Sequence, residues 1–343
     1  MGKMELAAAL MYRTSILNLL RRFRSSDLKI LAYHRIKDIG SENDYEFDAE
    51  LISASVSDFE WQVEHVKKFY NPTTFEEIVS DIENGRRVAK NSVIISFDDG
   101  FDDNYINAFP VLKKHGVPAT FFIATDYIGT TNPFWFDYVS YIIKKIPEGK
   151  YHLDNNNYII DITKDNKESE LCRLLKFLKG IPDDSRIKRI EELKTLYGVD
   201  IPSDGYNDCM PLTWNQVVEM SKNGMEIGSH TRSHPVLSQL DKSKLEDEIV
   251  NSRNIINDKI NNNCVAIAYP VGGKQDFNNE IKAMSESAYK IGCSYIAGSN
   301  SIPDDDRFEL KRLHVERYTS KALFAAMLAA PNYFRQGADE CYD

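Results

Sequence analysis

The sequence predicts an α/β protein whose parallel strands form a closed or nearly closed barrel with helices outside it. Three observations support this prediction: short apolar runs recur along the chain, helical patterns separate them, and polar residues follow most of the runs. Continuous apolar runs suit strands that are buried on both faces, as in parallel sheets. Repeated alternation of strand and helix around one core favours a (β/α)7 barrel over an open sheet.

Seven apolar runs are expected to form the barrel strands. Most of them are rich in Ile, Val, Phe, Tyr or Ala, which favour strands. The predicted strands are Lys29–Tyr33, Val93–Phe97, Ala119–Ala124, Met225–Ser229, Val265–Tyr269, Ile291–Ile296 and Arg312–Glu316.

Helical patterns lie between these runs. In the segment 56–70, Phe59, Val63 and Val66 share one helix face, and Ser57-Asp58 supplies capping residues. The predicted helices are Val56–Tyr70, Phe75–Asn84, Tyr105–His115, Trp214–Asn223 and Ser243–Asn261.

One region breaks the alternation, between the third and fourth predicted strands. Two helices with leucine and isoleucine at helical spacing are expected in an insertion at about 147–210. The expected organisation is an amphipathic helix at 1–26, a barrel domain at 27–320 that carries this insertion, and a C-terminal helix and tail at 321–343.

The composition is that of a globular protein, with 343 residues, 42% hydrophobic and 27% charged. A net charge of −10 and the lack of a Lys/Arg run argue against nucleic-acid binding. The five cysteines form no CxxC pair, which predicts reduced, mostly buried thiols.

Residues 4–24 are apolar and then basic, and Arg13 interrupts the apolar run. This order does not match a secretory signal, and the run is too short to span a bilayer. Two roles stay open for the expected helix: packing on the barrel, or contact with an anionic membrane surface. We expect a cytoplasmic protein, at the inner face of the membrane if the second role applies.

Titratable residues gather where the predicted strands end. His34 follows the first strand, Asp98-Asp99 the second, and His230 the fourth, with His234 four residues later. Because the loops after the strands form the active face of such barrels, these side chains are expected at one rim.

Two imidazoles and one carboxylate would suit a catalytic zinc site, which uses three protein ligands and leaves a position for water. Adjacent strand residues point to opposite faces, so Asp98 and Asp99 need not share a role. The alternative is a pair of unrelated surface histidines together with an acidic turn.

Three stretches together resemble the motifs of polysaccharide deacetylases, the NodB-like carbohydrate esterase family four: SFDDG at 96–100, SHTRSH at 229–234 and AYPVGG at 268–273. LAYHRI at 31–36, VLKKHGVPATFFI at 111–123 and FWFD at 134–137 add to the resemblance, which is to the branch with a FAYP-type third motif. It implies the NodB-homology fold, a distorted (β/α)7 barrel. It also implies a hydrolase that removes N-acetyl groups from an amino sugar of a polysaccharide or glycan precursor.

The resemblance implies that Asp99, His230 and His234 hold a divalent ion. Zinc is the default for such ligands, and cobalt, nickel and iron are compatible with them. Asp98 would be the general base that takes a proton from metal-bound water.

The remaining roles come from the same resemblance. The backbone N–H of Val271, which follows Tyr269 and Pro270 in the substrate and oxyanion turn, would stabilise the oxyanion. His34 is a further candidate near the metal, either as a substrate contact or as a residue behind the ligands, and the alternative is a buried strand-end histidine that the backbone satisfies. His314 would protonate the leaving amine, with an ordinary strand histidine as an equal alternative.

The third motif departs from the family, because Ala266-Ile267-Ala268 carries no arginine. Arg312 is expected to replace it and to orient Asp98. The family's fourth motif is an acidic residue with a tryptophan, and this chain has no clear match for it. The motifs therefore do not give the orientation of the general acid or the shape of the acyl pocket.

Two other functions compete with deacetylation. A catalytically inactive carbohydrate-binding barrel predicts loss of a ligand or of the base, but all four residues are present. A glycosidase needs two carboxylates about 5–10 Å apart, which adjacent acids fit badly. The expected partner is an N-acetylated saccharide of surface polysaccharide biosynthesis, and the oligomeric state stays open.

Overall fold

Seven parallel strands form a closed barrel in the computed structural model, which describes residues 3–14, 16–23, 27–42, 45–155, 157–197 and 208–334. The strand order is β1-β12-β11-β10-β9-β6-β5, and pairing of β1 with β5 closes the ring. This confirms the predicted fold class. The strands are β1 (Lys29–Tyr33), β5 (Ser92–Phe97), β6 (Thr120–Ile123), β9 (Glu226–Ser229), β10 (Ala266–Ala268), β11 (Ile291–Ala297) and β12 (Leu310–His314).

The predicted strands agree with the observed ones to within a residue or two. The largest shift is at β12, which begins at Leu310 instead of Arg312 because Leu310 pairs with Cys293 of β11. A short strand, β4 (Asn71–Pro72), pairs with the first residues of β5. Another pair, β2 (Arg35–Ile36) and β3 (Ile52–Ala54), lies beyond the end of β1.

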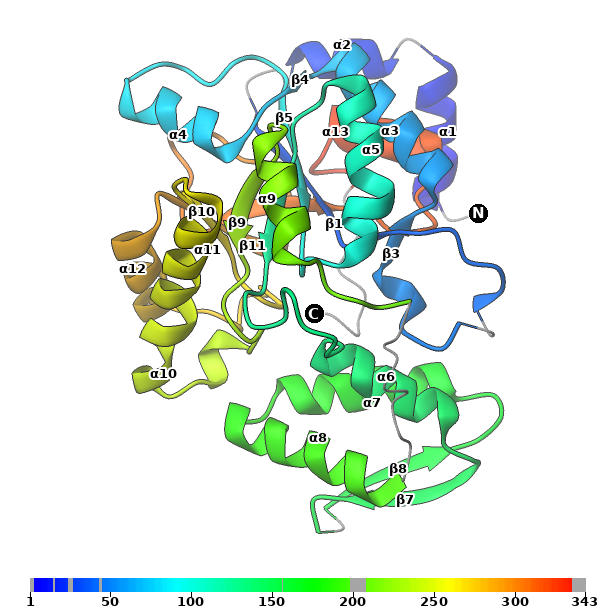
Figure 1. Cartoon of the computed structure of the whole chain (residues 1–343). Coiled ribbons are helices and arrows are strands. Elements are labelled where there is room, and N and C mark those ends of the chain that lie inside the picture. Colours follow the sequence, from blue (N-terminus) through cyan, green and yellow to red (C-terminus); the bar gives the residue numbers. More distant parts are fainter. Residues whose placement is uncertain are drawn as a thin grey trace.

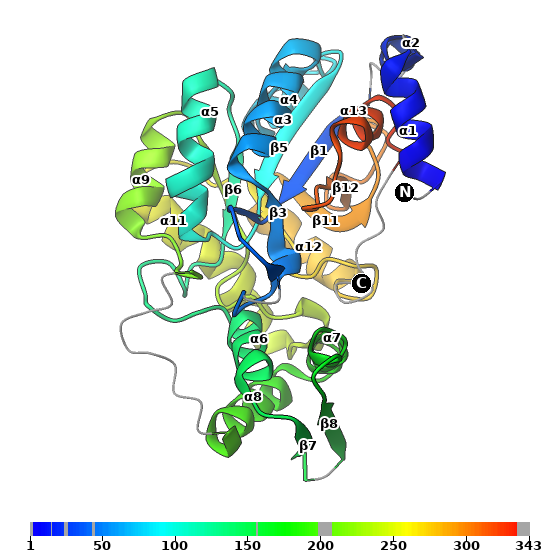
Figure 2. The same cartoon turned by 90° about the vertical axis from the view of Figure 1, so that its right-hand side faces the viewer.

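Helices surround the barrel (Figures 1 and 2). Side-chain oxygens cap several of them. At α3 the cap is Ser55, whose Oγ accepts from the Asp58 N–H, so the predicted Ser57-Asp58 cap is wrong: the helix begins earlier, at Val56. Two of the predicted helices contain π turns, η3 (Asn104–Ala108) and η5 (Asp247–Asn251). The surrounding helices are α3 (Val56–Phe69), α4 (Phe75–Glu83), α5 (Phe109–His115), α9 (Trp214–Lys222), α10 (Lys242–Glu246), α11 (Ser252–Ile260) and α12 (Asn279–Ala288).

A smaller unit with its own hydrophobic core lies at one end of the barrel, at the bottom of Figure 1. Its two predicted helices are α7 (Lys167–Lys179) and α8 (Asp183–Tyr197), and both pack against α6 (Trp135–Lys145). The unit also contains a hairpin of β7 (Gly149–Leu153) and β8 (Tyr158–Ile162). The sequence did not predict this hairpin, because β7 is mostly exposed and carries little apolar pattern.

The N-terminal segment forms two helices, α1 (Lys3–Arg13) and α2 (Ile16–Phe23), where the sequence predicted one. The Thr14 hydroxyl donates to the Met11 carbonyl at the break, a local bond that competes with helix continuation. Both helices pack against α13 (Lys321–Ala329), which is buried from Leu323 onward.

The cysteine prediction is partly wrong. Cys209, Cys264 and Cys293 are buried free thiols, as expected, but Cys172 is disulfide-bonded. Cys341 lies outside the described residues. Among the described residues, none of the helices combines the length and apolar character needed to cross a membrane.

Candidate active site

A pocket of about 800 Å³, open solvent included, lies at the carboxyl ends of the barrel strands. Side chains from the barrel and from the smaller unit line it together. Eight of the residues predicted from the sequence line this pocket: His34, Asp98, Asp99, His230, His234, Tyr269, Val271 and Arg312.

Asp99, His230 and His234 converge at the base of this pocket. Asp99 Oδ1 lies 3.1 Å from His234 Nε2 and 3.5 Å from His230 Nε2. All three side chains are buried, and their ligand atoms lie within 4.8 Å of one another. The donor set of two imidazole nitrogens and one carboxylate is the one used by catalytic zinc and related ions.

The unpaired atoms of this cluster fit a bound cation. Asp99 Oδ2 is buried without a hydrogen-bond partner. Burial raises the pKa of Asp99. Burial also lowers the pKa of His230, and it lowers the pKa of His234 to about 3. The imidazoles are therefore neutral, as metal ligands must be, and an ion would compensate the buried carboxylate.

His230 is held in one tautomer. Its Nδ1 lies 2.8 Å from the Ala268 carbonyl oxygen, so Nδ1 carries the proton and Nε2 keeps its lone pair for a ligand bond. The neighbouring His234 is held by α6, because Trp135 Nε1 donates to the His234 carbonyl at 3.1 Å. The Phe136 ring meets the His234 imidazole edge-on.

The backbone at this cluster takes conformations that side chains rarely adopt. Asp99, Thr231 and His234 have φ values of 72°, 66° and 57°. Left-handed backbone at non-glycine residues is costly and clusters at functional sites. The loop that carries both histidines must therefore be stabilised by its surroundings.

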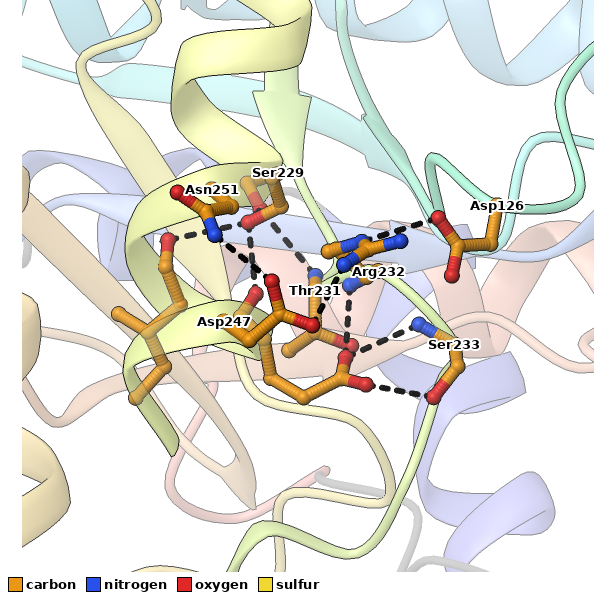
Figure 3. A network of polar contacts seen from close by, with 10 residues as sticks. Asp126, Ser229, Thr231, Arg232, Ser233, Asp247 and Asn251 are labelled. Carbon is orange, nitrogen blue, oxygen red and sulfur yellow. Dashed lines mark hydrogen bonds and ion pairs between the residues drawn. The ribbon is translucent and has the colours of Figure 1, made fainter. Parts of the chain in front are cut away.

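A buried carboxylate on the π turn η5 provides that stabilisation. Glu248 Oε2 accepts the backbone N–H groups of Arg232 and Ser233, at 2.8 and 2.9 Å, and Oε1 accepts the Ser233 hydroxyl. Figure 3 shows the adjoining contacts, in which Arg232 lies between Asp126 and Asp247. One acidic side chain thus fixes the two residues between Thr231 and His234.

Asp98 is held by Arg312. Arg312 Nη1 lies 2.7 Å from Asp98 Oδ1, and Nε donates to the Ser294 carbonyl at 2.8 Å. Burial alone would raise the pKa of Asp98, but the Arg312 guanidinium, with His230 and His34, holds it below its ordinary value. Asp98 is therefore ionised, and the arginine that the third motif lacks has a counterpart on β12.

The two remaining histidines differ in position. His34 follows β1, and its ring lines the pocket beside Asp98 and Asp99. The His314 ring lies flat on Tyr295, with centroids 3.7 Å apart, and it is buried outside the pocket lining. His314 therefore does not line the pocket in this structure, and its role as the general acid stays a prediction.

The turn after β10 brings Val271 to the pocket in a left-handed conformation, with φ 61°. A side chain at the next position, Gly272, would meet the Tyr269 carbonyl and the Tyr295 N–H at 2.8 Å. Pro270 does not line the pocket. Tyr269 lines it, but its hydroxyl donates to the Phe308 carbonyl, so that group faces the core.

Several pocket residues were not predicted. Trp135 and Phe136 belong to the quoted FWFD stretch, which was the available signal, whereas Tyr295 lies within an ordinary apolar strand. The unpredicted lining residues are Glu50, Leu51, Ser53, Trp135, Phe136, Lys179, Tyr295, Val315 and Glu316.

Comparison with known proteins gives consistent results. The polysaccharide deacetylase family model matches residues 85–291. A poly-beta-1,6-N-acetyl-D-glucosamine N-deacetylase of Staphylococcus epidermidis is 36% identical over 121 residues, which cover 32% of this chain and 40% of that protein. YxkH of Bacillus subtilis (strain 168) is 24% identical over 260 residues, 76% of this chain and 64% of its own length. The chain therefore spans less than two thirds of the length of either relative.

The fold is also that of a solved deacetylase structure. Streptococcus pyogenes PplD, described in complex with acetate, superposes with a TM-score of 0.56 over 86% of this chain and 94% of that one, at 22% identity. The family match extends over more than half of the chain and includes the SFDDG, SHTRSH and AYPVGG stretches. The chain belongs to the polysaccharide deacetylase family.

Proposed function

We propose that this protein removes N-acetyl groups from the amino sugars of a polysaccharide or glycan precursor, using a divalent ion held by Asp99, His230 and His234. The single observation that carries the proposal is the convergence of these three ligands with the Asp98–Arg312 pair in one pocket. An inactive binding barrel would not need an ionised carboxylate oriented beside a ligand set.

A divalent ion bound there would polarise the amide carbonyl and lower the pKa of a water molecule. Zinc is the ion that we propose, because its usual ligands include this donor set. Metal affinity would fall as the histidines become protonated, but their burial keeps them neutral through the physiological pH range.

Asp98 would accept the proton of the attacking water. Its ion pair with Arg312 keeps it ionised and fixes the direction of its second oxygen. Removing this base should cost about 10²–10⁴-fold in rate.

His34 would donate the proton that the leaving amine requires. It lines the pocket on the side of Asp98 and Asp99. Burial lowers the pKa of His34, and the two carboxylates offset part of this effect. The Val271 N–H would donate a hydrogen bond to the oxyanion of the tetrahedral intermediate, since Val271 lines the same pocket.

The substrate class rests on the relatives. The name of the Staphylococcus epidermidis protein specifies a β-1,6-linked N-acetylglucosamine polymer. The aromatic wall of Trp135 and Phe136 supports a sugar ring as the group that enters the pocket.

Acetate release tests the proposal. Wild-type protein reconstituted with zinc should release acetate from β-1,6-linked N-acetylglucosamine oligosaccharides, and Asp98→Asn should not. Absence of release by the wild type from β-1,6-linked, β-1,4-linked and monomeric N-acetylglucosamine, with one ion bound per chain, would contradict deacetylation of this sugar.

A further inference from the structure

The two N-terminal helices present apolar side chains to solvent. Leu6 and Leu10 lie four residues apart on α1, and Ile16, Leu19 and Phe23 lie three and four apart on α2. Each of the five is between 43% and 77% exposed. These residues form one stripe on each helix, which we call the N-terminal apolar surface.

The opposite faces of the same helices hold them on the barrel. Ala8 and Leu17 are buried in the main core, and the Ser320 hydroxyl donates to Glu5 at 2.9 Å. The Arg21 guanidinium lies 4.1 Å from the centroid of the Phe69 ring on α3. The helices are therefore docked, and the N-terminal apolar surface is not the face that packs on the barrel. Exposed apolar surfaces rimmed by polar residues mark interaction sites.

Basic residues accompany this surface. Lys3, Arg13 and Arg22 are exposed beside it. The first 26 residues hold five Lys or Arg and one acidic residue, in a chain with a net charge of −10. An apolar stripe with basic flanks is typical of helices that lie in a bilayer interface, where cationic side chains are attracted to anionic lipids. Two copies of this basic surface would repel each other, which argues against a second copy as its partner.

We propose that α1 and α2 form a docking surface for an anionic lipid bilayer. Both views place these helices at the end of the molecule opposite α6, α7 and α8, next to which the pocket lies (Figures 1 and 2). A protein bound in this way would direct its pocket away from the lipid plane. A saccharide that extends from the membrane would then reach the pocket more readily than a sugar at the lipid headgroups. Only this last step rests on the proposed deacetylation; the lipid binding does not.

Sedimentation with vesicles tests the proposal on the full chain. Wild-type protein should sediment with vesicles of phosphatidylglycerol and phosphatidylcholine, and less with vesicles of phosphatidylcholine alone. The doubly substituted Leu10→Glu, Phe23→Glu protein should bind the anionic vesicles at least about ten-fold more weakly, because two anchoring side chains become charged. Ile187→Glu on α8, at an isoleucine that is also exposed but lies far from this surface, is the control and should bind like the wild type.

Arg22→Gln separates the electrostatic contribution from the apolar one. It should weaken binding to anionic vesicles and make that binding less sensitive to salt, while the melting temperature stays unchanged. Failure of the wild type to bind either vesicle would overturn the proposal. So would a wild-type dimer that the Leu10→Glu, Phe23→Glu substitutions dissociate, because a second copy would then cover the surface. Acetate release from a soluble oligosaccharide should be equal in all these proteins. This second assay reports on the proposed deacetylation independently of lipid binding, so failure of one proposal can be distinguished from failure of the other.

Discussion

Two groups of acidic and histidine residues within the described part of the chain bring three ligand atoms together. Asp99, His230 and His234 do so at the base of the pocket, and Glu60, Glu64 and His115 do so where α3 meets the end of α5. The first group is fully buried, whereas Glu64 is exposed and its two neighbours are half-buried. Donor atoms and spacing alone do not distinguish the two.

Their electrostatic surroundings do distinguish them. Glu60 already accepts Lys114 Nζ at 2.6 Å, and it lies 3.0 Å from His115 Nε2. These two partners hold the pKa of Glu60 below its ordinary value, so a metal ion would have to displace a lysine. In the buried group Asp99 Oδ2 has no partner, and burial raises the pKa of Asp99. Both groups offer three donor atoms. What identifies the group expected to bind a metal ion is its buried carboxylate oxygen without a partner.

The largest effect is expected at the base. Asp98→Asn should lower kcat for acetate release about 10²–10⁴-fold, because the amide cannot accept the proton of water. The metal content should stay at the wild-type value, since Asp98 is not among the three ligands. A kcat within ten-fold of the wild type, at unchanged metal content, would assign the proton transfer to another group.

The next effect distinguishes the two histidines. His34→Gln should lower kcat by about 10²-fold, whereas His314→Gln should change it less than about three-fold, because only His34 lines the pocket. The measurement is the rate at saturating substrate for both variants, with circular dichroism melting to verify that each is folded. A larger loss in His314→Gln than in an equally stable His34→Gln would restore the role that the sequence motif suggested.

A smaller effect is expected from the residue that positions the histidine loop. Glu248→Ala should weaken metal binding about 10–100-fold, the usual range for residues that orient ligands. Chelator competition measures the affinity, and the visible bands of the cobalt-substituted protein report ligand geometry. Glu248→Gln keeps one acceptor oxygen, which can replace Oε2 toward the Arg232 and Ser233 N–H groups, and it should recover part of the affinity.

Glu64→Ala, in the exposed group, is the matched control for this experiment and should leave metal affinity unchanged. Equal affinity in Glu248→Ala and the wild type, in a protein that unfolds cooperatively, would mean that the loop around Thr231 and His234 keeps its left-handed backbone without Glu248.

The barrel could be predicted because its determinants are local. Runs such as Lys29–Tyr33 are apolar on both faces, and their alternation with helices leaves few architectures. The Asp98, Asp99, His230 and His234 set could be predicted because short motifs carry it. The hairpin β7–β8 could not, because its strands are stabilised mainly by pairing with each other and show little apolar pattern.

The positions of His34 and His314 illustrate a different limit. His34 follows a predicted strand and His314 lies within one, and a strand pattern does not say how deep a side chain lies in a barrel. The contact of His314 with Tyr295 is a tertiary contact between β11 and β12, and nothing within the local sequence indicates it. The same holds for Glu248, which reaches the histidine loop from a π turn on another element.

Metal content after saturation with zinc and removal of unbound ion tests the central claim most directly. Wild type and His115→Ala should each hold one ion per chain, and His234→Ala should hold none, because only the buried group binds the ion. A wild type that holds no ion, or an ion that is lost in His115→Ala and kept in His234→Ala, would contradict the assignment of the pocket as a metal-dependent deacetylase site.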